Sequence, residues 1–114
     1  MRKDRYRLED IVEAIENITR RTEAGRVAFF EDEMLRTWVV HHLQIIGEAA
    51  RNLSTGVRVR RSDIPWEQII GFRNILVHEY FGVDYEEVWR VVEDDLTRLR
   101  EAASKLLEEE TASE

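Results

Sequence analysis

Four stretches of the chain repeat apolar residues three and four positions apart, and this periodicity constrains the fold more than any other feature. Gly (5 residues) and Pro (1 residue) are too scarce among the 114 residues to supply the many turns of a β-sandwich. The stretches are Tyr6 to Ala24, Glu31 to Leu53, Pro65 to His78 and Asp84 to Leu107. We therefore expect an all-α protein, an antiparallel up-and-down bundle of four to five helices. A single domain would span residues 1–107, followed by an acidic tail over residues 108–114.

Residues with special backbone chemistry mark the ends of these stretches. Ser54 to Ile64 lacks helical periodicity and contains Gly56, so we expect a loop there. Pro65 suits the first turn of a helix, where its fixed φ angle and missing N–H are tolerated. Gly82 is available for a left-handed stop after the third helix, and Asp84 is expected to cap the fourth.

The tryptophans and two of the histidines are better explained by packing than by ligand binding. Trp38, Trp66 and Trp89 fall at core-like positions of the expected helices, so burial is favoured over the stacking of bases. His41 and His42 are adjacent, which separates their rings by about 100° on a helix and prevents good chelation of one metal ion. His42 continues the apolar stripe and is predicted to lie in the core or on a dimer face, and no metal site is expected.

The charge of the chain is negative overall but unevenly distributed. A formal net charge of −7 at pH 7 argues against a protein coated in phosphate-binding residues. Between Glu48 and Asp63, however, the sequence contains no acidic residue. Four arginines fall within this interval: Arg51, Arg58, Arg60 and Arg61. They form either a solvated basic loop or a local site for a polyanion.

Several functional classes are excluded or disfavoured. The chain has no cysteine, so disulfides, a thiolate zinc site and a thiol nucleophile are excluded. No apolar run approaches the roughly 18 to 20 residues that a membrane span needs. The charged start M-R-K-D-R-Y-R leads into a mixed segment, not a signal-peptide core. We expect a cytoplasmic protein with no membrane partner, whose chemistry would use His, carboxylate, Tyr, Ser or Thr.

Residues 73 to 80 read R-N-I-L-V-H-E-Y, which sets chemically capable side chains among core-type residues. Arg73 and His78 are five residues apart, about 140° round a regular helix. They converge only if the helix ends or loosens, or if the long arginine side chain curls across. The alternative is structural, because cations near a helix C-terminus also compensate the helix dipole.

The motif lies in a wider pattern that resembles a known family. The segments I-I-G-E-A-A (45–50), I-P-W (64–66), I-I-G-F-R-N-I-L-V-H-E-Y-F-G-V-D (69–84) and V-W (88–89) are similar to the HepT-like branch of the HEPN superfamily. These small all-α proteins are typically encoded beside a minimal MNT-type nucleotidyltransferase. The resemblance implies a metal-independent endoribonuclease without cofactor, used as the toxin of a toxin-antitoxin pair. It also implies a homodimer whose two R-x-x-x-x-H-x-Y motifs face each other.

The resemblance assigns roles to individual residues. Arg73 and His78 would be catalytic, and Asn74 matches the polar residue that commonly follows the arginine. Tyr80 would orient phosphate or accept AMP from the nucleotidyltransferase antitoxin, with which larger hetero-oligomers could form. Metal-free RNA cleavage needs a base, an acid and a cation, and facing copies of His78 could supply the first two. Arg51, Arg58, Arg60 and Arg61 would then contribute positive charge for RNA.

A second hypothesis uses the same residues without catalysis. The protein could be a regulatory or substrate-presenting partner of the nucleotidyltransferase, in which the motif holds a nucleotide or accepts AMP. Both hypotheses predict the same neighbouring partner. They differ in whether replacing His78 abolishes an activity on RNA.

Overall fold

The computed structural model describes residues 2–78 and 82–113, except for the side chain of Arg2. Seven α-helices and one π-helical segment make up most of these residues. They are α1 Arg2–Arg21, α2 Arg26–Glu31, α3 Glu33–Arg51, α4 Thr55–Arg60, α5 Trp66–His78, α6 Tyr85–Arg90, the π-helix η2 Val91–Asp95 and α7 Leu96–Ala112. The described part of the chain contains no strand, which confirms the all-α fold.

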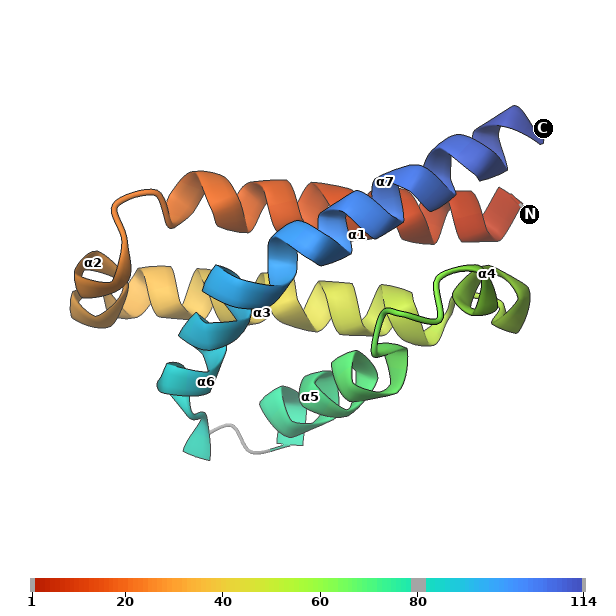
Figure 1. The fold of residues 1–114 in the computed structure, drawn as a ribbon. Coiled ribbons are helices and arrows are strands. Elements are labelled where there is room, and N and C mark those ends of the chain that lie inside the picture. The colour runs from red at the N-terminus through yellow and green to blue at the C-terminus, as the bar shows by residue number, and fades with distance from the viewer. Residues whose placement is uncertain (1, 79–81, 114) are drawn as a thin grey trace.

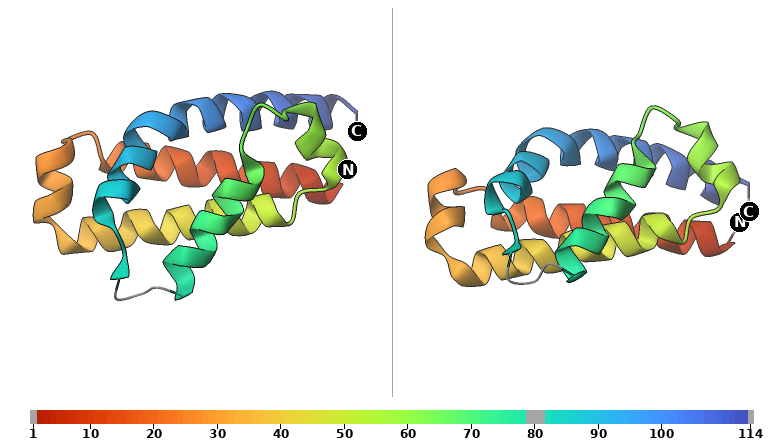
Figure 2. Two further views of the ribbon diagram at one scale, coloured as in Figure 1. Left: turned by 60° about the horizontal axis from the view of Figure 1, so that its bottom comes forward. Right: turned by 90° about the horizontal axis from the view of Figure 1, so that it is seen from below.

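The four helices of 13 residues or more alternate in direction and form the bundle (Figure 1). Helix α1 packs against both α3 and α7, and α5 packs obliquely on α3. The N- and C-terminal ends lie at the same end of the bundle, as the views in Figure 2 also show. The predicted up-and-down arrangement is confirmed, with the short helices α2, α4 and α6 in the connections between the long ones.

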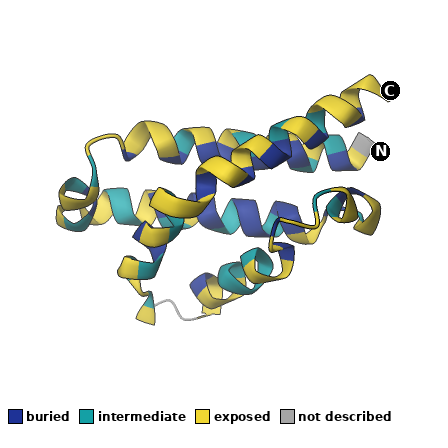
Figure 3. Ribbon diagram, viewed as in Figure 1, coloured by how far each residue is buried: buried dark blue, intermediate teal, exposed yellow. Residues whose placement is uncertain are grey.

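The apolar stripes face one another across the bundle and form its core (Figure 3). From α1 alone, Leu8, Ile11 and Ile18 are completely buried. Burial of a Leu or Ile side chain contributes about 1.5 to 3 kcal/mol to stability. The stripes therefore hold the bundle together and fix which face of each helix remains available for function.

Two of the three tryptophans lie where the pattern predicted. Trp66 and Trp89 are buried, whereas Trp38 is 38% exposed, so the prediction of a core position was wrong for Trp38. Its ring packs on the ring of His42 at a centroid distance of 4.3 Å. The Arg21 guanidinium lies 5.5 Å from the centroid of the same ring. Trp38 thus lies on the surface of α3, held by an aromatic contact and a cation–π contact.

The turn between α1 and α3 contains a helix that the periodicity did not predict. Gly25 adopts a positive φ of 93°, a conformation that favours glycine, and α2 begins at the next residue. Phe29 of α2 is fully buried and lies 5.1 Å from Phe30 and 5.2 Å from Trp89, measured between ring centroids. An aromatic cluster therefore anchors this end of the bundle.

The segment expected to be a loop, Ser54 to Ile64, contains the helix α4. The side chain of Ser54 accepts a hydrogen bond from the amide of Val57 and so caps this helix. Val57 itself is buried, which gives the short helix a core contact. Pro65 directly precedes α5, and its carbonyl accepts the first helical hydrogen bond from Ile69, as its suitability for a helix start predicted.

The last predicted helix is divided into α6, η2 and α7. Asp84 caps α6 by accepting hydrogen bonds from the amides of Glu86 and Glu87, which confirms its predicted role. Gly82 does not adopt a positive φ, so the expected left-handed stop is not formed. Helix α7 continues to Ala112, so most of the expected acidic tail is helical, and Glu110 is buried.

Candidate functional site

The side chain of Arg73 lies where α5 comes very close to α3. A Cβ atom built at Gly47 of α3 would lie 2.2 Å from the Cβ of Arg73 and 2.7 Å from its Cγ. Such distances are far shorter than a carbon–carbon contact, so only glycine allows this approach. The absence of a side chain at Gly47 therefore brings Arg73 beside the next residue of α3, Glu48.

Polar groups hold the guanidinium of Arg73 on two sides. Its Nη2 lies 3.1 Å from Oε2 of Glu48, and its Nη1 donates a hydrogen bond of 3.1 Å to Oδ1 of Asn74. The predicted supporting residue, Asn74, thus contacts the predicted catalytic arginine directly. The Nε of Arg73 is buried and has no hydrogen-bond partner among the described residues. The side chain as a whole is 24% exposed.

Glu48 connects this arginine to a second one. Its Oε1 accepts hydrogen bonds from Nη2 of Arg51 at 3.0 Å and from Nδ2 of Asn52 at 3.1 Å. The hydrogen bond from Arg51 lowers the pKa of Glu48, and the hydrogen bond from Asn52 and the charge of Arg73 lower it further. Desolvation raises this pKa, but the net shift is downward. Glu48 is therefore an ionised carboxylate between two guanidinium groups, and this three-residue network carries a net charge of +1.

A surface groove of about 280 Å³ runs beside Arg73, between α1, α3 and α5. Its lining residues are Arg7 and Asp10 of α1, His41, Gln44, Ile45, Glu48 and Ala49 of α3, and Arg73 and Val77 of α5. Arg7 forms no ion pair with any of the described residues. The groove thus combines two arginines with two carboxylates and neutral hydrogen-bonding side chains, so an anionic ligand would bind through the arginine N–H groups and not through an excess of positive charge.

His78, the second predicted catalytic residue, is exposed at the C-terminal end of α5. It does not line the groove, and α5 remains a regular helix from Arg73 to His78. The two side chains therefore leave the helix about 140° apart. Within one chain, the structure does not bring Arg73 and His78 together. The predicted Tyr80 and its neighbour Glu79 lie outside the described residues.

Of the four arginines predicted to bind RNA, only Arg51 belongs to the network around Arg73. Arg60 lies 3.3 Å from Glu109 of α7, and Arg61 makes two contacts of 3.0 Å with Asp63. Arg58 lies on α4 near Trp66, whose indole N–H donates to the carbonyl of Arg58 at 3.2 Å. The charges of Arg60 and Arg61 are thus partly neutralised within the bundle, and an RNA-binding role for the four arginines remains a prediction.

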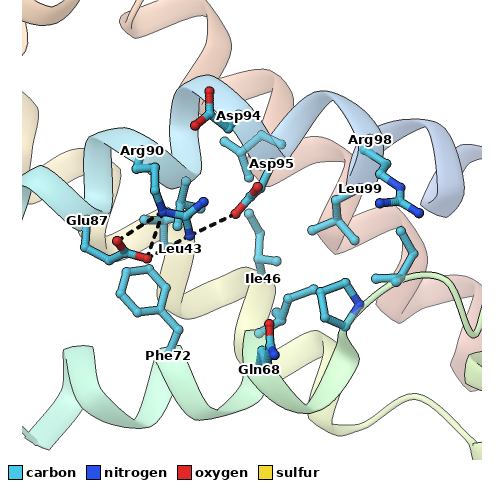
Figure 4. Close-up of a pocket in the computed structure, with 15 residues that line it drawn as sticks. Leu43, Ile46, Gln68, Phe72, Glu87, Arg90, Asp94, Asp95, Arg98 and Leu99 are labelled. Atoms are coloured by element: carbon cyan, nitrogen blue, oxygen red, sulfur yellow. Dashed lines mark hydrogen bonds and ion pairs between the residues drawn. The ribbon is translucent and has the colours of Figure 1, made fainter.

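A larger cavity of about 390 Å³ lies on the other side of α5 (Figure 4). Leu43, Ile46 and Phe72 contribute apolar surface to it. At its rim, Arg90 contacts Glu87 at 2.7 Å and Asp95 at 3.3 Å. These contacts raise the pKa of Arg90, and the hydrogen bonds from Arg90 lower the pKa of Glu87. The three charges at this rim therefore sum to −1, in contrast to the +1 of the network around Arg73.

The remaining histidines differ in environment. His42 is buried, as the apolar stripe predicted, and its Nδ1 lies 2.8 Å from the carbonyl oxygen of Trp38. His41 is exposed and lines the groove. Among the described residues there is no group of three or more His, Asp or Glu side chains that could hold a metal ion. Nor is any described helix both long and apolar enough to cross a membrane.

Sequence reasoning identified Arg73, His78 and Asn74 but assigned no role to Gly47, Glu48, His41 or the groove residues of α1. The segment I-I-G-E-A-A, which contains Gly47 and Glu48, was part of the pattern that indicated the family. A glycine followed by a glutamate in an apolar stripe is the signal that could have found them. Their link to Arg73 depends on the packing of two helices, which sequence periodicity does not specify.

The chain is similar to a family of known proteins. Residues 11–106 match the family Ribonuclease HepT-like. A probable ribonuclease HepT of Thermococcus cleftensis is 38% identical over 100 residues, which cover 87% of this chain and 91% of that protein. A protein of Caldanaerobacter subterraneus subsp. tengcongensis, provisionally named an RNase, is 34% identical over 111 residues, covering 96% of this chain and 99% of the relative.

A protein of Methanocaldococcus jannaschii, also provisionally named an RNase, is 35% identical over 94 residues, covering 82% of this chain and 86% of the relative. No solved structure matched the chain. The family match covers most of the bundle, from the middle of α1 to the later turns of α7. The chain therefore belongs to the ribonuclease HepT-like family of all-α HEPN proteins.

Proposed function

We propose that the protein is a metal-independent endoribonuclease in which Arg73 and His78 are the catalytic residues. The observation that carries this proposal is the guanidinium of Arg73, held at the edge of an open groove by Glu48 and Asn74. The groove belongs to a chain of the HepT-like family, and several relatives bear the name ribonuclease or RNase. Arginine forks onto two phosphate oxygens and keeps its charge at all relevant pH values.

The proposed reaction is an intramolecular transfer within RNA. His78 takes the proton of a 2′-hydroxyl, whose oxygen then forms a bond to the adjacent phosphorus. The bond from phosphorus to the 5′-oxygen breaks, and a second histidine supplies the proton to that leaving oxygen. Arg73 stabilises the negative charge that develops on the phosphoryl oxygens. The products are a 2′,3′-cyclic phosphate and a 5′-hydroxyl.

This chemistry calls for a homodimer. Each chain has one His78, and the helix directs Arg73 and His78 to different sides, so two facing chains would complete the site. The exposed apolar residues Ile75 and Val77 of α5 support a dimer, because they lie beside His78 in sequence and a second copy could cover them. In such a dimer, the base and the acid would come from different chains.

The family resemblance supports a biological role as the toxin of a toxin-antitoxin pair. Its antitoxin would be an MNT-type nucleotidyltransferase that transfers AMP to Tyr80, two residues after His78. The added phosphate would place negative charge in a site meant for RNA phosphate and so repel the substrate. A larger hetero-oligomer with this antitoxin is part of the proposal, as is a cytoplasmic location.

The decisive experiment incubates the purified protein with total cellular RNA in the presence of a chelator. We expect cleavage that leaves 5′-hydroxyl ends, reduced at least about 10²-fold in His78→Ala and in Arg73→Ala. Arg98→Ala is the matched control, because it removes an exposed arginine of α7 that pairs with Asp63 and does not line the groove. Intact RNA with the unmodified protein would support the alternative, a non-catalytic nucleotide-binding partner of the nucleotidyltransferase.

A further inference from the structure

The contacts of Glu48 differ from those of an ordinary surface carboxylate. One oxygen faces Arg73, 25 positions further along the chain on another helix. The other oxygen accepts hydrogen bonds from Arg51 on its own helix and from Asn52 at the end of that helix. The Oε2 atom that faces Arg73 is inaccessible to solvent and accepts no hydrogen bond from the described residues, so its contact with Arg73 is an ion pair. Because α3 and α5 come very close at Gly47, the carboxylate of Glu48 lies directly beside the guanidinium of Arg73.

We propose that Glu48 is the positioning residue for Arg73: it holds the guanidinium in the orientation that receives the phosphate of RNA. This inference rests on the proposed ribonuclease function and extends it to a residue outside the R-x-x-x-x-H motif. Glu48 does not contact substrate in this proposal. It acts through Arg73, while Arg51 and Asn52 hold Glu48 itself in place from the opposite side.

Glu48 and Asn74 together form a clamp on the guanidinium of Arg73. The hydrogen-bonding capacity of arginine explains how this clamp leaves N–H groups available for substrate. A guanidinium has five N–H groups in one plane. One of the two terminal nitrogens of Arg73 lies in an ion pair with Glu48 and the other donates to Asn74, which leaves N–H groups for another acceptor. A side chain whose two terminal nitrogens are already held loses little rotamer entropy when a phosphate binds. The clamp therefore preorganises Arg73 for binding a phosphate of RNA.

The negative charge of Glu48 should affect substrate binding and the rate of the chemical step differently, and the two effects can be measured separately. A carboxylate beside a phosphate site repels the substrate in the ground state as well as in the transition state. Arg51 offsets part of this repulsion, because it leaves the network of Arg51, Glu48 and Arg73 with a net charge of +1. Glu48 should therefore weaken ground-state binding slightly while it raises the rate of the chemical step.

The test replaces Glu48 by Gln, which keeps the shape and removes the charge, and measures kcat and KM separately for cleavage of a defined RNA. We expect kcat to fall about 10- to 100-fold, the scale of a misplaced catalytic group, with KM unchanged or lower. Glu87→Gln is the matched control. Glu87 pairs with an arginine three residues later, as Glu48 does with Arg51, but it lines the cavity on the other side of α5. That control should leave both constants unchanged.

A second variant separates orientation from charge. Glu48→Asp keeps the carboxylate but draws it back by one methylene, away from Arg73. If orientation is what matters, kcat stays low in Glu48→Asp, and if the charge alone acts, kcat returns to the level of the unmodified protein. Recovery in Glu48→Asp, or an unchanged kcat in Glu48→Gln, would overturn the proposal.

Nitrogen-15 NMR of the Arg73 side chain tests the clamp without relying on catalysis. Rotation about the bond between Cζ and the Nη atoms should be slow in the unmodified protein and fast in Glu48→Gln, while Glu87→Gln leaves it slow. Fast rotation in the unmodified protein would overturn the positioning role. If RNA remains intact but rotation is slowed by Glu48, the ribonuclease proposal fails and the clamp on Arg73 stands as a feature of a binding site.

Discussion

At the scale of single residues, Gly47 controls the position of Arg73. We predict that Gly47→Ala destabilises the protein by about 1 to 3 kcal/mol, because the new Cβ would lie 2.2 Å from the Cβ of Arg73 and α5 would have to move. This cost exceeds the gain of up to about 1 kcal/mol that alanine brings to a helix interior. Denaturant unfolding measures the difference, and RNA cleavage should fall with it.

A neighbouring glycine supplies the control for this prediction. Gly71 lies within α5, and a Cβ atom built there meets nothing within 4 Å. Gly71→Ala should therefore stabilise the protein by up to about 1 kcal/mol through helix propensity alone. Equal stability of the two alanine variants would contradict the close contact between α3 and α5.

Asp63 is the residue whose effect should depend most clearly on pH. Arg61 donates two hydrogen bonds to its carboxylate and Arg98 contacts it from α7, and the pKa of Asp63 is therefore well below its ordinary value. A pKa lowered by folding stabilises the folded state above the unfolded pKa of about 4, and this contribution is lost as the pH falls below it.

We accordingly expect Asp63→Asn to lower the Tm at pH 7, with the difference from the unmodified protein narrowing as the pH falls below about 4. Thermal unfolding at a series of pH values measures this. Asp94→Asn is the control, because Asp94 forms no ion pair within the described residues. A Tm difference for Asp63→Asn that persisted undiminished to pH 2 would count against the ion pairs as its cause.

At the scale of elements, a buried carboxylate fixes α4 to the start of α1. Asp4 accepts hydrogen bonds of 2.8 Å from both the amide and the hydroxyl of Ser54, which in turn caps α4. We predict that Asp4→Ala costs about 1 to 3 kcal/mol, because it leaves the two partly buried donors of Ser54 unsatisfied. Hydrogen exchange should show faster opening of α4.

The exposed Glu13 of the same helix provides the comparison. Glu13→Ala should change stability by no more than about 0.5 kcal/mol and leave exchange in α4 unaltered. If Asp4→Ala behaved in the same way, the connection between Asp4 and Ser54 would not contribute to stability.

The elements also explain how far sequence reasoning could reach. The long helices were predictable because each buries one continuous stripe, as Leu8, Ile11 and Ile18 do in α1. The short helices α2 and α4 were missed because six residues are too few to display a helical period. Their stability comes from tertiary contacts, such as those of Phe29, rather than from local propensity.

The break between α6 and α7 has a similar origin. The apolar spacing continues through Val91 to Asp95 without interruption, so the pattern predicted a single helix. The π-helical turn there alters the rotation of the chain without any proline or glycine. Arg90, which contacts Glu87 before the turn and Asp95 within it, is one residue that spans this irregularity.

In the candidate site too, the residues of one local segment could be predicted from the sequence, whereas the residue brought in by helix packing could not. Arg73, Asn74 and His78 were predictable because they lie together in one segment whose pattern resembles a family. Glu48 was not predictable as their partner, since its contact with Arg73 depends on how closely two helices pack at Gly47. The four basic residues of 51–61 looked like one patch in sequence, but folding separates Arg51 from Arg60 and Arg61 by giving each a different acidic partner.

At the scale of the whole molecule, the proposed active site requires two chains, and α5 carries the surface that would join them. Ile75 is 54% exposed although it lies in the middle of the motif. An apolar residue at the centre of an interface contributes more to association than one at its rim. Replacing it by a glutamate would place an unpaired charge in the interface, which is strongly unfavourable for association.

We therefore predict that Ile75→Glu converts the dimer to a monomer in sedimentation equilibrium and abolishes RNA cleavage, although Arg73 and His78 are unchanged. Val59→Glu is the matched control, because Val59 is 61% exposed on α4, at the other end of α5 from His78. It should remain dimeric and active. Cleavage by monomeric Ile75→Glu at the normal rate would mean that one chain supplies both base and acid. The second proton-transfer group would then have to come from the groove, and His41 is the histidine that lines it.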